Sequence, residues 1–254
     1  MEIGLSLSLT SNKGVGGSTV NQQFDALVAA LSPLYAYNVA DAATRWRNDA
    51  GTLPATTAGQ TIGRLDDKST NARNASQATS AAKPTLGNSG ALWWIDGDGV
   101  DDFLRTSSFA VTQPWWRMSA IRQISWKASG RVFGPAFATS AFLLQAGSSP
   151  ALALFDGTGA QPSNTGAAIG ADAVVYESHN GNSSLLGVDA GANATAPPSP
   201  GATAGDGVTI FSDATGIVFG NNRVYATIAG SGTLTAPQIA SVRTVLAALQ
   251  GRTL

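Results

Sequence analysis

The segment WWIDGDGVDDFL, residues 93–104, places four aspartates and two glycines between two hydrophobic anchors. It can be a calcium loop, a catalytic acid cluster or a tight turn between strands. A calcium hand needs oxygen ligands at positions 1, 3 and 5, glycine at position 6 and glutamate at position 12. Counted from Asp96, positions 5, 6 and 12 are valine, aspartate and serine, so the segment differs from the calcium-hand motif at three required positions. We therefore predict an Asp-Gly turn that joins two strands, with an irregular calcium site at Asp96, Asp98 or Asp101 as the less favoured alternative.

Short apolar runs, separated by Gly, Asn, Asp and Pro, continue on both sides of this turn through residues 34–228. Many short strands with turn signals between them are typical of an all-β fold. We predict a two-sheet antiparallel jelly-roll sandwich. Its predicted strands are 92–95, 103–106, 116–124, 131–133, 142–145, 151–155, 174–178, 184–188, 208–210 and 223–228.

The two ends of the chain carry different patterns. Near the start, apolar residues alternate with small ones, which predicts a half-buried strand of Ile3, Leu5, Leu7 and Leu9. A helix is expected from Ser18 or Thr19 to Leu31, because apolar residues then recur at helical spacing. Thr235 predicts the start of a C-terminal helix that Gly251 ends. We therefore divide the chain into an N-terminal strand-helix appendage, 1–33, and a sandwich with one C-terminal helix, 34–254.

The composition excludes several classes of function. Charged residues make up 12% of the 254 residues, the net charge is −1 and no basic run occurs, so a nucleic-acid partner is not expected. The absence of cysteine removes disulfides, thiolate catalysis and cysteine-bound zinc. No apolar run is long enough for membrane insertion, and the N-terminus lacks the features of a signal peptide. We expect a protein made in a cytoplasm, with no cofactor.

The residues needed for common hydrolytic mechanisms are sparse. Glycoside hydrolysis needs two carboxyl groups placed across the scissile bond, and the only glutamates are Glu2 and Glu177. The single histidine, His179, would share a strand face with Glu177, but no Gly-x-Ser-x-Gly nucleophile elbow is present. We predict that the protein is not an enzyme and has no catalytic residues.

Six tryptophans remain as candidates for a binding surface. In the pairs Trp93-Trp94 and Trp115-Trp116, successive side chains of a strand must point to opposite faces of the sheet. One ring of each pair is then expected on the outside of its sheet. Trp115, Trp116 and Trp93 are therefore the candidate contacts for a glycan or a partner protein.

An ordered series of motifs resembles a known family. The series consists of Asp67-Lys68-Ser69, Gln77-Ala78-Thr79 with Lys83-Pro84, the segment 98–104 and the closing segment 221–249. It resembles the concanavalin A-like, laminin-G-like jelly-roll domains of tailed-bacteriophage virion structural proteins. The chain departs from that pattern at Thr70 and Ala72, where the family often has glycine.

The resemblance implies a non-enzymatic virion structural protein that displays a lectin-like module for attachment or glycan binding. A capsid or tail decoration or scaffold protein without a ligand is the alternative, and a polysaccharide depolymerase is the third possibility. Expected partners are other phage virion proteins, further copies of the chain and a host surface glycan. The residues Ile3, Leu5, Leu7 and Leu9 would then dock the protein on the virion.

Overall fold

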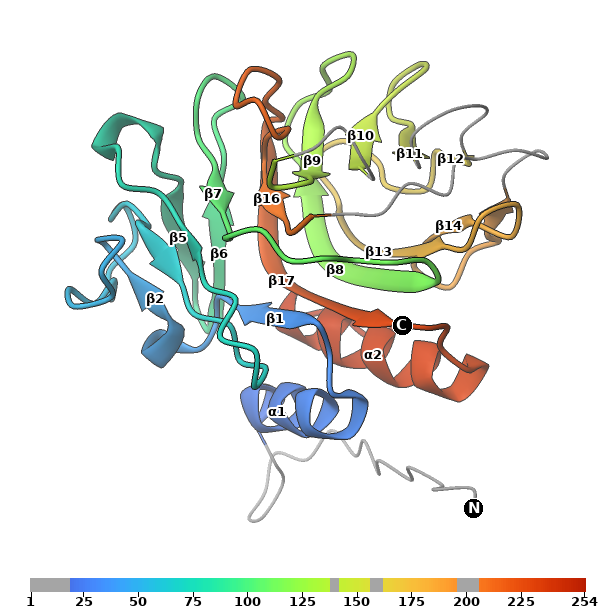
Figure 1. Cartoon of the computed structure of the whole chain (residues 1–254), viewed down its shortest axis with the longest axis horizontal. Coiled ribbons are helices and arrows are strands. Elements are labelled where there is room, and N and C mark those ends of the chain that lie inside the picture. Colours follow the sequence, from blue (N-terminus) through green and yellow to red (C-terminus); the bar gives the residue numbers. More distant parts are fainter. Residues whose placement is uncertain (1–18, 138–141, 156–161, 196–205) are drawn as a thin grey trace.

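The computed structural model describes residues 19–137, 142–155, 162–195 and 206–254. Two antiparallel sheets of eight and nine strands pack face to face, and two α-helices form a third layer below them (Figure 1). We call the sheet between the helices and the other sheet the middle sheet, and the remaining one the outer sheet. The predicted all-β, two-sheet antiparallel sandwich is confirmed.

The middle sheet has its longest strands at its centre. Its order is β15 (Ala194–Thr195), β14 (Leu185–Val188), β13 (Asp172–His179), β8 (Trp115–Gln123), β17 (Asn222–Ser231), β6 (Leu92–Asp96) and β5 (Thr85–Ser89), and β1 (Tyr35–Asn38) also pairs with β17.

The outer sheet is built from shorter strands. Its order is β12 (Ser163–Asn164), β11 (Leu152–Phe155), β10 (Phe142–Gln145), β9 (Arg131–Gly134), β16 (Thr209–Ile210), β7 (Leu104–Arg105), β4 (Ala75–Ser76), β3 (Arg64–Leu65) and β2 (Arg45–Trp46). Each of the ten strands expected from the sequence overlaps a strand of one of these two sheets. The short 3-10 helices η1 (Ala42–Thr44) and η2 (Ser80–Ala82) lie in the connections.

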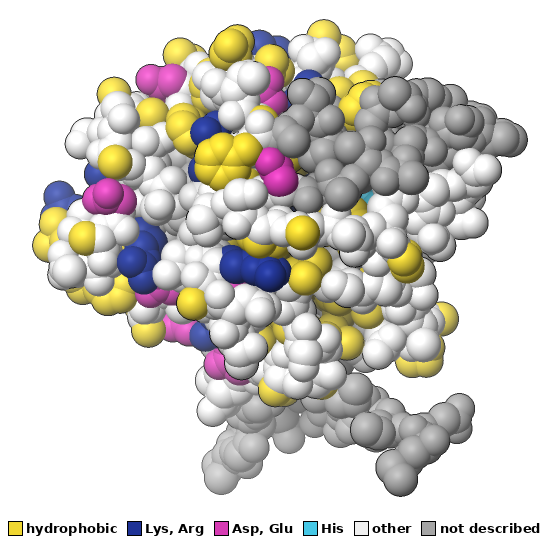
Figure 2. All heavy atoms as spheres, viewed as in Figure 1, with side chains coloured by type: hydrophobic (Ala, Val, Ile, Leu, Met, Phe, Trp, Pro, Cys, Tyr) yellow, Lys and Arg dark blue, Asp and Glu magenta, His cyan; other side chains and the backbone are white. Residues whose placement is uncertain are grey.

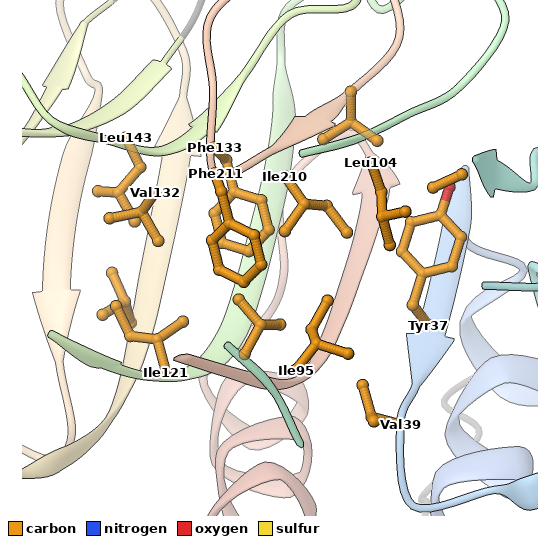
Figure 3. Packing of buried hydrophobic residues seen from close by; sticks show 14 of the residues in the cluster. Tyr37, Val39, Ile95, Leu104, Ile121, Val132, Phe133, Leu143, Ile210 and Phe211 are labelled. Carbon is orange, nitrogen blue, oxygen red and sulfur yellow. The ribbon is translucent and has the colours of Figure 1, made fainter. Parts of the chain in front are cut away.

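The main hydrophobic core lies between the two sheets (Figure 3). Ile95 and Ile121 from the middle sheet face Phe133, Leu143 and Ile210 from the outer sheet, and all five are fully buried. Removing apolar surface from water contributes about 25 cal/mol per Å², so burial of this layer stabilises the packing of the two sheets.

The two helices cover the other face of the middle sheet. The helices α1 (Val20–Leu31) and α2 (Ala236–Leu249) each begin with a capping box, at Thr19 and Thr235. Phe24 and Leu27 of α1 are buried in a second cluster with residues of α2 and the middle sheet. Neither helix in the described ranges has the length and apolar character needed to cross a bilayer. The expected strand at residues 3–9 lies outside the described residues, and the attachment role of residues 1–33 stays a prediction.

A buried ion pair joins two central strands of the middle sheet. Arg117 Nε and Nη2 donate to Glu177 Oε1 and Oε2 at 2.7 and 2.5 Å, and both side chains are at most 2% exposed. Desolvation opposes ionisation of Glu177, but the charge of Arg117 outweighs it and holds the pKa of the carboxyl below its usual range. The guanidinium also lies 4.4 Å from the ring centre of Phe133 in the outer sheet.

Breaking this pair from one side should cost more stability than removing both charges. Arg117→Met or Glu177→Leu alone leaves one buried charge without its main partner, with an expected loss of about 3–5 kcal/mol in the free energy of unfolding. In Arg117→Met, His179 Nε2, 3.5 Å from Glu177 Oε2, can replace part of the lost interaction. The double variant Arg117→Met/Glu177→Leu should lose less than either single variant. Urea unfolding of the three variants measures their free energies of unfolding. A double variant that is less stable than both single variants would contradict the prediction.

The loop after β3 contains a strained alanine at one of the two positions where the sequence departs from the family pattern. Ala72 has φ 53°, in the left-handed region that glycine adopts without strain. Asp67 holds this loop closed, since its carboxylate accepts hydrogen bonds from the backbone N–H groups of Ser69 and Arg73.

Ala72→Gly should therefore stabilise the protein by about 0.5–1 kcal/mol, the left-handed penalty of alanine less the added freedom of glycine in the unfolded chain. Ala78→Gly is the control, because Ala78 is exposed and lacks a positive φ. We expect it to lower stability. Thermal unfolding compares them, and equal shifts for both variants would contradict the role of the backbone angle.

Candidate functional site

The acidic segment that opens the sequence analysis is a turn. Asp98 Oδ1 accepts the backbone N–H groups of Val100 and Asp101 at 2.8 and 3.2 Å, and Gly99 supplies φ 78°. The strands on either side do not pair with each other, as a hairpin would require: β6 lies in the middle sheet and β7 in the outer sheet. The turn therefore carries the chain from one sheet to the other.

Three carboxylates gather at this turn. Asp98, Asp101 and Asp102 each offer an oxygen within 4.8 Å of the others, a spacing that suits a shared cation. Burial, together with the charges of Asp98 and Asp101, raises the pKa of Asp102 to about 7. Asp96, included in the sequence-based calcium alternative, instead pairs with Arg223 at 2.8 Å and accepts a hydrogen bond from Trp94.

The Trp115-Trp116 pair occupies buried positions. Trp115 stacks on His179 with ring centres 3.9 Å apart, on the face toward the outer sheet. Trp116 points the other way and lies in the cluster formed with the helices. Their exposed fractions are 4% and 2%, which corrects the expectation that one ring of the pair is open to a ligand. The rings do alternate between the two faces, but the helix layer covers the outward one.

The rings of the Trp93-Trp94 pair also point to opposite faces of the middle sheet. Trp93 packs against the core between the sheets with the guanidinium of Arg45 3.9 Å from its ring centre. Trp94 lies on the helix-facing side, where Arg223 covers its ring at 3.9 Å. The structure therefore places Trp93 among inward-facing side chains.

The outward face of the outer sheet carries a different set of side chains. α1 and α2 pack on each other and on the middle sheet, which leaves this face without a helix cover from either of them. Directly paired residues of neighbouring strands share one face of a sheet. The pairing therefore forms one cross-strand row across five strands: Trp46, Arg64, Ser76, Arg105 and Thr209.

The inward orientation of the adjacent residues confirms which way this row points. Leu65, Ala75, Leu104 and Ile210 each neighbour a row residue in sequence and belong to the core between the sheets. Because side chains alternate along a strand, the row residues face away from that core. Four of the five are only partly buried, while Thr209 is buried.

One end of the row is fixed by a carboxylate. Asp66 accepts a hydrogen bond from Trp46 Nε1 at 2.7 Å and from Arg64 Nε at 2.5 Å. This arrangement holds an indole ring, a carboxylate and a guanidinium together on the sheet surface.

The other end of the row is aromatic. The guanidinium carbon of Arg105 lies 5.0 Å from the ring centre of Phe103 and 5.7 Å from that of Phe137, which is 58% exposed. The hydrogen bonds that Arg105 makes within the described residues are long, 3.3 Å to Thr209 Oγ1 and 3.4 Å to the Asp213 carbonyl oxygen. Burial lowers the pKa of Arg105, and Asp213 and Asp206 oppose this shift.

These side chains combine aromatic rings with guanidinium and carboxylate groups. Rings supply flat apolar area, and the charged groups supply hydrogen bonds that fix the orientation of a ligand. On the side shown in Figure 2, charged side chains are scattered among uncharged ones and form no continuous basic stripe. The chemistry of the row suits a neutral, hydroxyl-rich ligand better than a polyphosphate.

Sequence reasoning missed this row because its members come from five strands that are two residues long. Strands of that length contain no visible alternation. The available signal was the presence of single arginines, Arg64 and Arg105, within otherwise small or apolar runs.

The fold is similar to those of several solved structures, although no sequence family matches. No protein-family model and no curated protein sequence matches the chain. The solved structure of a GH54 α-L-arabinofuranosidase soaked with a cyclic sulfate inhibitor is similar, with TM-score 0.65 and 12% identity over 91% of this chain. An arabinofuranosidase complexed with arabinofuranosyl-α-1,2-xylobiose gives TM-score 0.60 and 11% identity over 89% of this chain. This chain covers 65% of each of those two proteins, slightly under two thirds of their length.

The alignment with a smaller neighbour covers almost the whole of that neighbour. Domain 4 of AbnA, a GH43 extracellular arabinanase from Geobacillus stearothermophilus, in complex with arabinotriose, has TM-score 0.50 and 12% identity. The alignment covers 82% of this chain and 96% of that domain. At these identities the likeness establishes the fold: a β-sandwich of the kind found in glycoside hydrolases.

These findings contradict two expectations from the sequence. The prediction of a non-enzymatic bacteriophage virion structural protein, as an attachment module or as a capsid or tail decoration, is wrong, because the proteins that share the fold are carbohydrate-active. The prediction that the protein is not an enzyme is wrong for the same reason. The sandwich part of the family resemblance is confirmed, whereas its phage part has no support.

The raised pKa of Asp102 predicts a pH dependence of stability. The folded-state pKa of about 7 lies above the usual value of 3.8, so the folded protein binds more protons than the unfolded chain between these values. Stability should therefore fall as the pH rises from 4 to 7. Asp102→Asn, which keeps an oxygen acceptor for the Asp98 N–H, should show a smaller fall. Urea unfolding at intervals across this range tests it, and parallel curves for the two proteins would contradict it.

Proposed function

We propose that this protein binds a glycan chain on the outward face of its outer sheet. The observation that carries the proposal is the cross-strand row from Trp46 to Arg105 on the face that neither α1 nor α2 covers. Neighbouring strands lie about 4.8 Å apart, so a row across four strands extends over roughly 14 Å. That length suits consecutive sugar units better than a single small ligand.

The two ends of the row offer complementary contacts. At one end, Asp66 and Arg64 present an acceptor and a donor beside the Trp46 ring. At the other, Phe137 is exposed next to the Arg105 guanidinium. Sugars have an apolar ring face and a polar edge, so a stacked ring with a hydrogen-bonding group beside it can bind both.

The wider comparisons support a role on glycans. The neighbours with similar folds are two arabinofuranosidases and a domain of an arabinanase seen with arabinotriose. The ordered motifs from Asp67 to Leu104 further support a concanavalin A-like, laminin-G-like jelly roll, a fold class that includes lectins.

A second candidate function is glycoside hydrolysis at the acidic turn. Asp102 has a carboxyl pKa of about 7, the property of a general acid, and the carboxylates of Asp98 and Asp101 lie within 4.8 Å. Retaining glycosidases place their two carboxyl groups about 5–5.5 Å apart. Asp102 is buried and Asp98 is exposed at the same turn, so Asp98 is the carboxylate that a bound chain would meet first. Release of reducing sugar from arabinan or arabinoxylan, lost in Asp102→Asn, tests this candidate.

Arg105→Ala should weaken binding of soluble arabinan, arabinoxylan or xylan by about 10-fold or more, since an arginine beside aromatic rings in a binding surface contributes about 1–3 kcal/mol. Phe137→Ala should act in the same direction. Affinity electrophoresis in gels that contain each polysaccharide measures the change. Arg122→Ala is the matched control: Arg122 is also a partly exposed strand arginine, but it lies on the middle sheet, paired with Asp172 at 2.7 Å. Absence of binding to all three polysaccharides, or equal losses in Arg105→Ala and Arg122→Ala, would contradict the proposal.

A further inference from the structure

A separate surface pocket lies beside α1. Its volume is about 510 Å³, and its walls come from α1, the segment after it and the loops at residues 41–44 and 67–70. Pockets of roughly 300–1,000 Å³ suit small molecules. This pocket belongs to the helix layer, so it is distinct from the glycan-binding face proposed above.

The ammonium group of Lys68 bridges two of its walls. Lys68 Nζ lies 3.0 Å from Asp25 Oδ1 on α1 and also hydrogen-bonds to Asp41 Oδ2 in the next loop. The lysine side chain is 13% exposed, whereas the Asp25 side chain is 51% exposed. The bridge fixes the helix against the loops and leaves the Asp25 carboxylate open to solvent.

The charges lining the pocket do not balance. The carboxylates of Asp25, Asp41 and Asp67 face one ammonium, that of Lys68, so three negative charges less one positive charge leave a net charge of −2. Asp67 is already occupied by backbone donors, since it accepts the N–H groups of Ala36 in β1 and of Ser69 in its own loop. The exposed Asp25 is therefore the carboxylate best placed to receive a second cation.

The remaining walls are suited to a hydroxylated ligand. Ser32 and Thr70 contribute hydroxyl groups, and Val28, Ala29 and Pro33 form an apolar side. A sugar ring can place its apolar face on that side and its hydroxyls toward the polar wall.

We propose that this pocket binds a small hydroxylated ammonium compound of the amino-sugar class, with the ammonium on Asp25 and the ring against Ala29. The negative lining selects the cationic sugar over neutral and acidic ones, because an anion would face a wall with an excess of carboxylates over ammonium groups.

The test titrates the ¹⁵N-labelled full chain with glucosamine, glucose and glucuronate, at about pH 6 where the amine is protonated. Glucosamine should shift the backbone amide signals of residues 28–32 and 67–70 saturably. Glucose should bind at least fivefold more weakly, and glucuronate should cause no saturable shift.

Two variants on one helix separate pocket binding from nonspecific effects. Ala29 and Ala30 are adjacent exposed residues of α1, but only Ala29 lines the pocket. Ala29→Phe should fill the pocket and reduce glucosamine affinity at least tenfold, whereas Ala30→Phe should leave it unchanged. Asp25→Asn should abolish the preference for glucosamine over glucose.

Three results would overturn the proposal: no saturable shift with any of the sugars, equal effects of Ala29→Phe and Ala30→Phe, or a preference for glucosamine that persists in Asp25→Asn. None of these results affects the glycan-binding face, which lies on the outer sheet.

Discussion

The faces of the two sheets determine how this protein is organised. A strand sends alternate side chains to opposite faces, so two packed sheets have four faces, each of which must be covered or polar. Two faces form the core between the sheets, and the helix layer covers a third with residues such as Phe24 and Leu246. The fourth, on the outer sheet, carries arginine, serine and a half-buried tryptophan across β2, β3, β4 and β7, and a small apolar cluster with Leu144 and Ala153 across β10 and β11. The position of the candidate site follows from this arrangement.

The sequence predicted most strands but not which of their faces are covered. In WWRMSAIRQ, the residues of β8, eight of the nine positions are buried because helices pack on one face and the outer sheet on the other. Periodicity identifies the strand, yet it does not distinguish a face that meets water from one that meets a helix. The C-terminal helix was predicted as well, but its docking on Trp116 depends on contacts between residues more than 100 positions apart. For this reason the sequence predicts one ring of each tryptophan pair on the outside of its sheet, although the helix layer covers that side.

At the acidic turn, nearby residues determine the bend, but they do not determine which sheet each flanking strand joins. The bend itself follows from residues within five positions of one another, because Asp98 accepts N–H groups ahead of it and Gly99 adopts a positive φ. Its flanking strands enter different sheets, and nothing within the turn determines that. Similarly, Arg105 neighbours Ser76 on one side and Thr209 on the other, although these residues are 29 and 104 positions away in the chain. A row of this kind exists only after the sheet has formed.

The strand arginines of the sandwich differ in whether a carboxylate pairs with them. Arg117, Arg122 and Arg223 each face a carboxylate across a strand pair, at 2.5, 2.7 and 2.8 Å. For Arg117, which is 2% exposed, such pairing satisfies a guanidinium that the fold has removed from water. Arg105 makes no ion pair within 4.0 Å among the described residues, and its neighbours there are two aromatic rings and long hydrogen bonds to oxygen. Arg105 therefore keeps donor capacity beside the exposed Phe137, and the proposed glycan-binding face depends on this pairing of a guanidinium with an exposed ring.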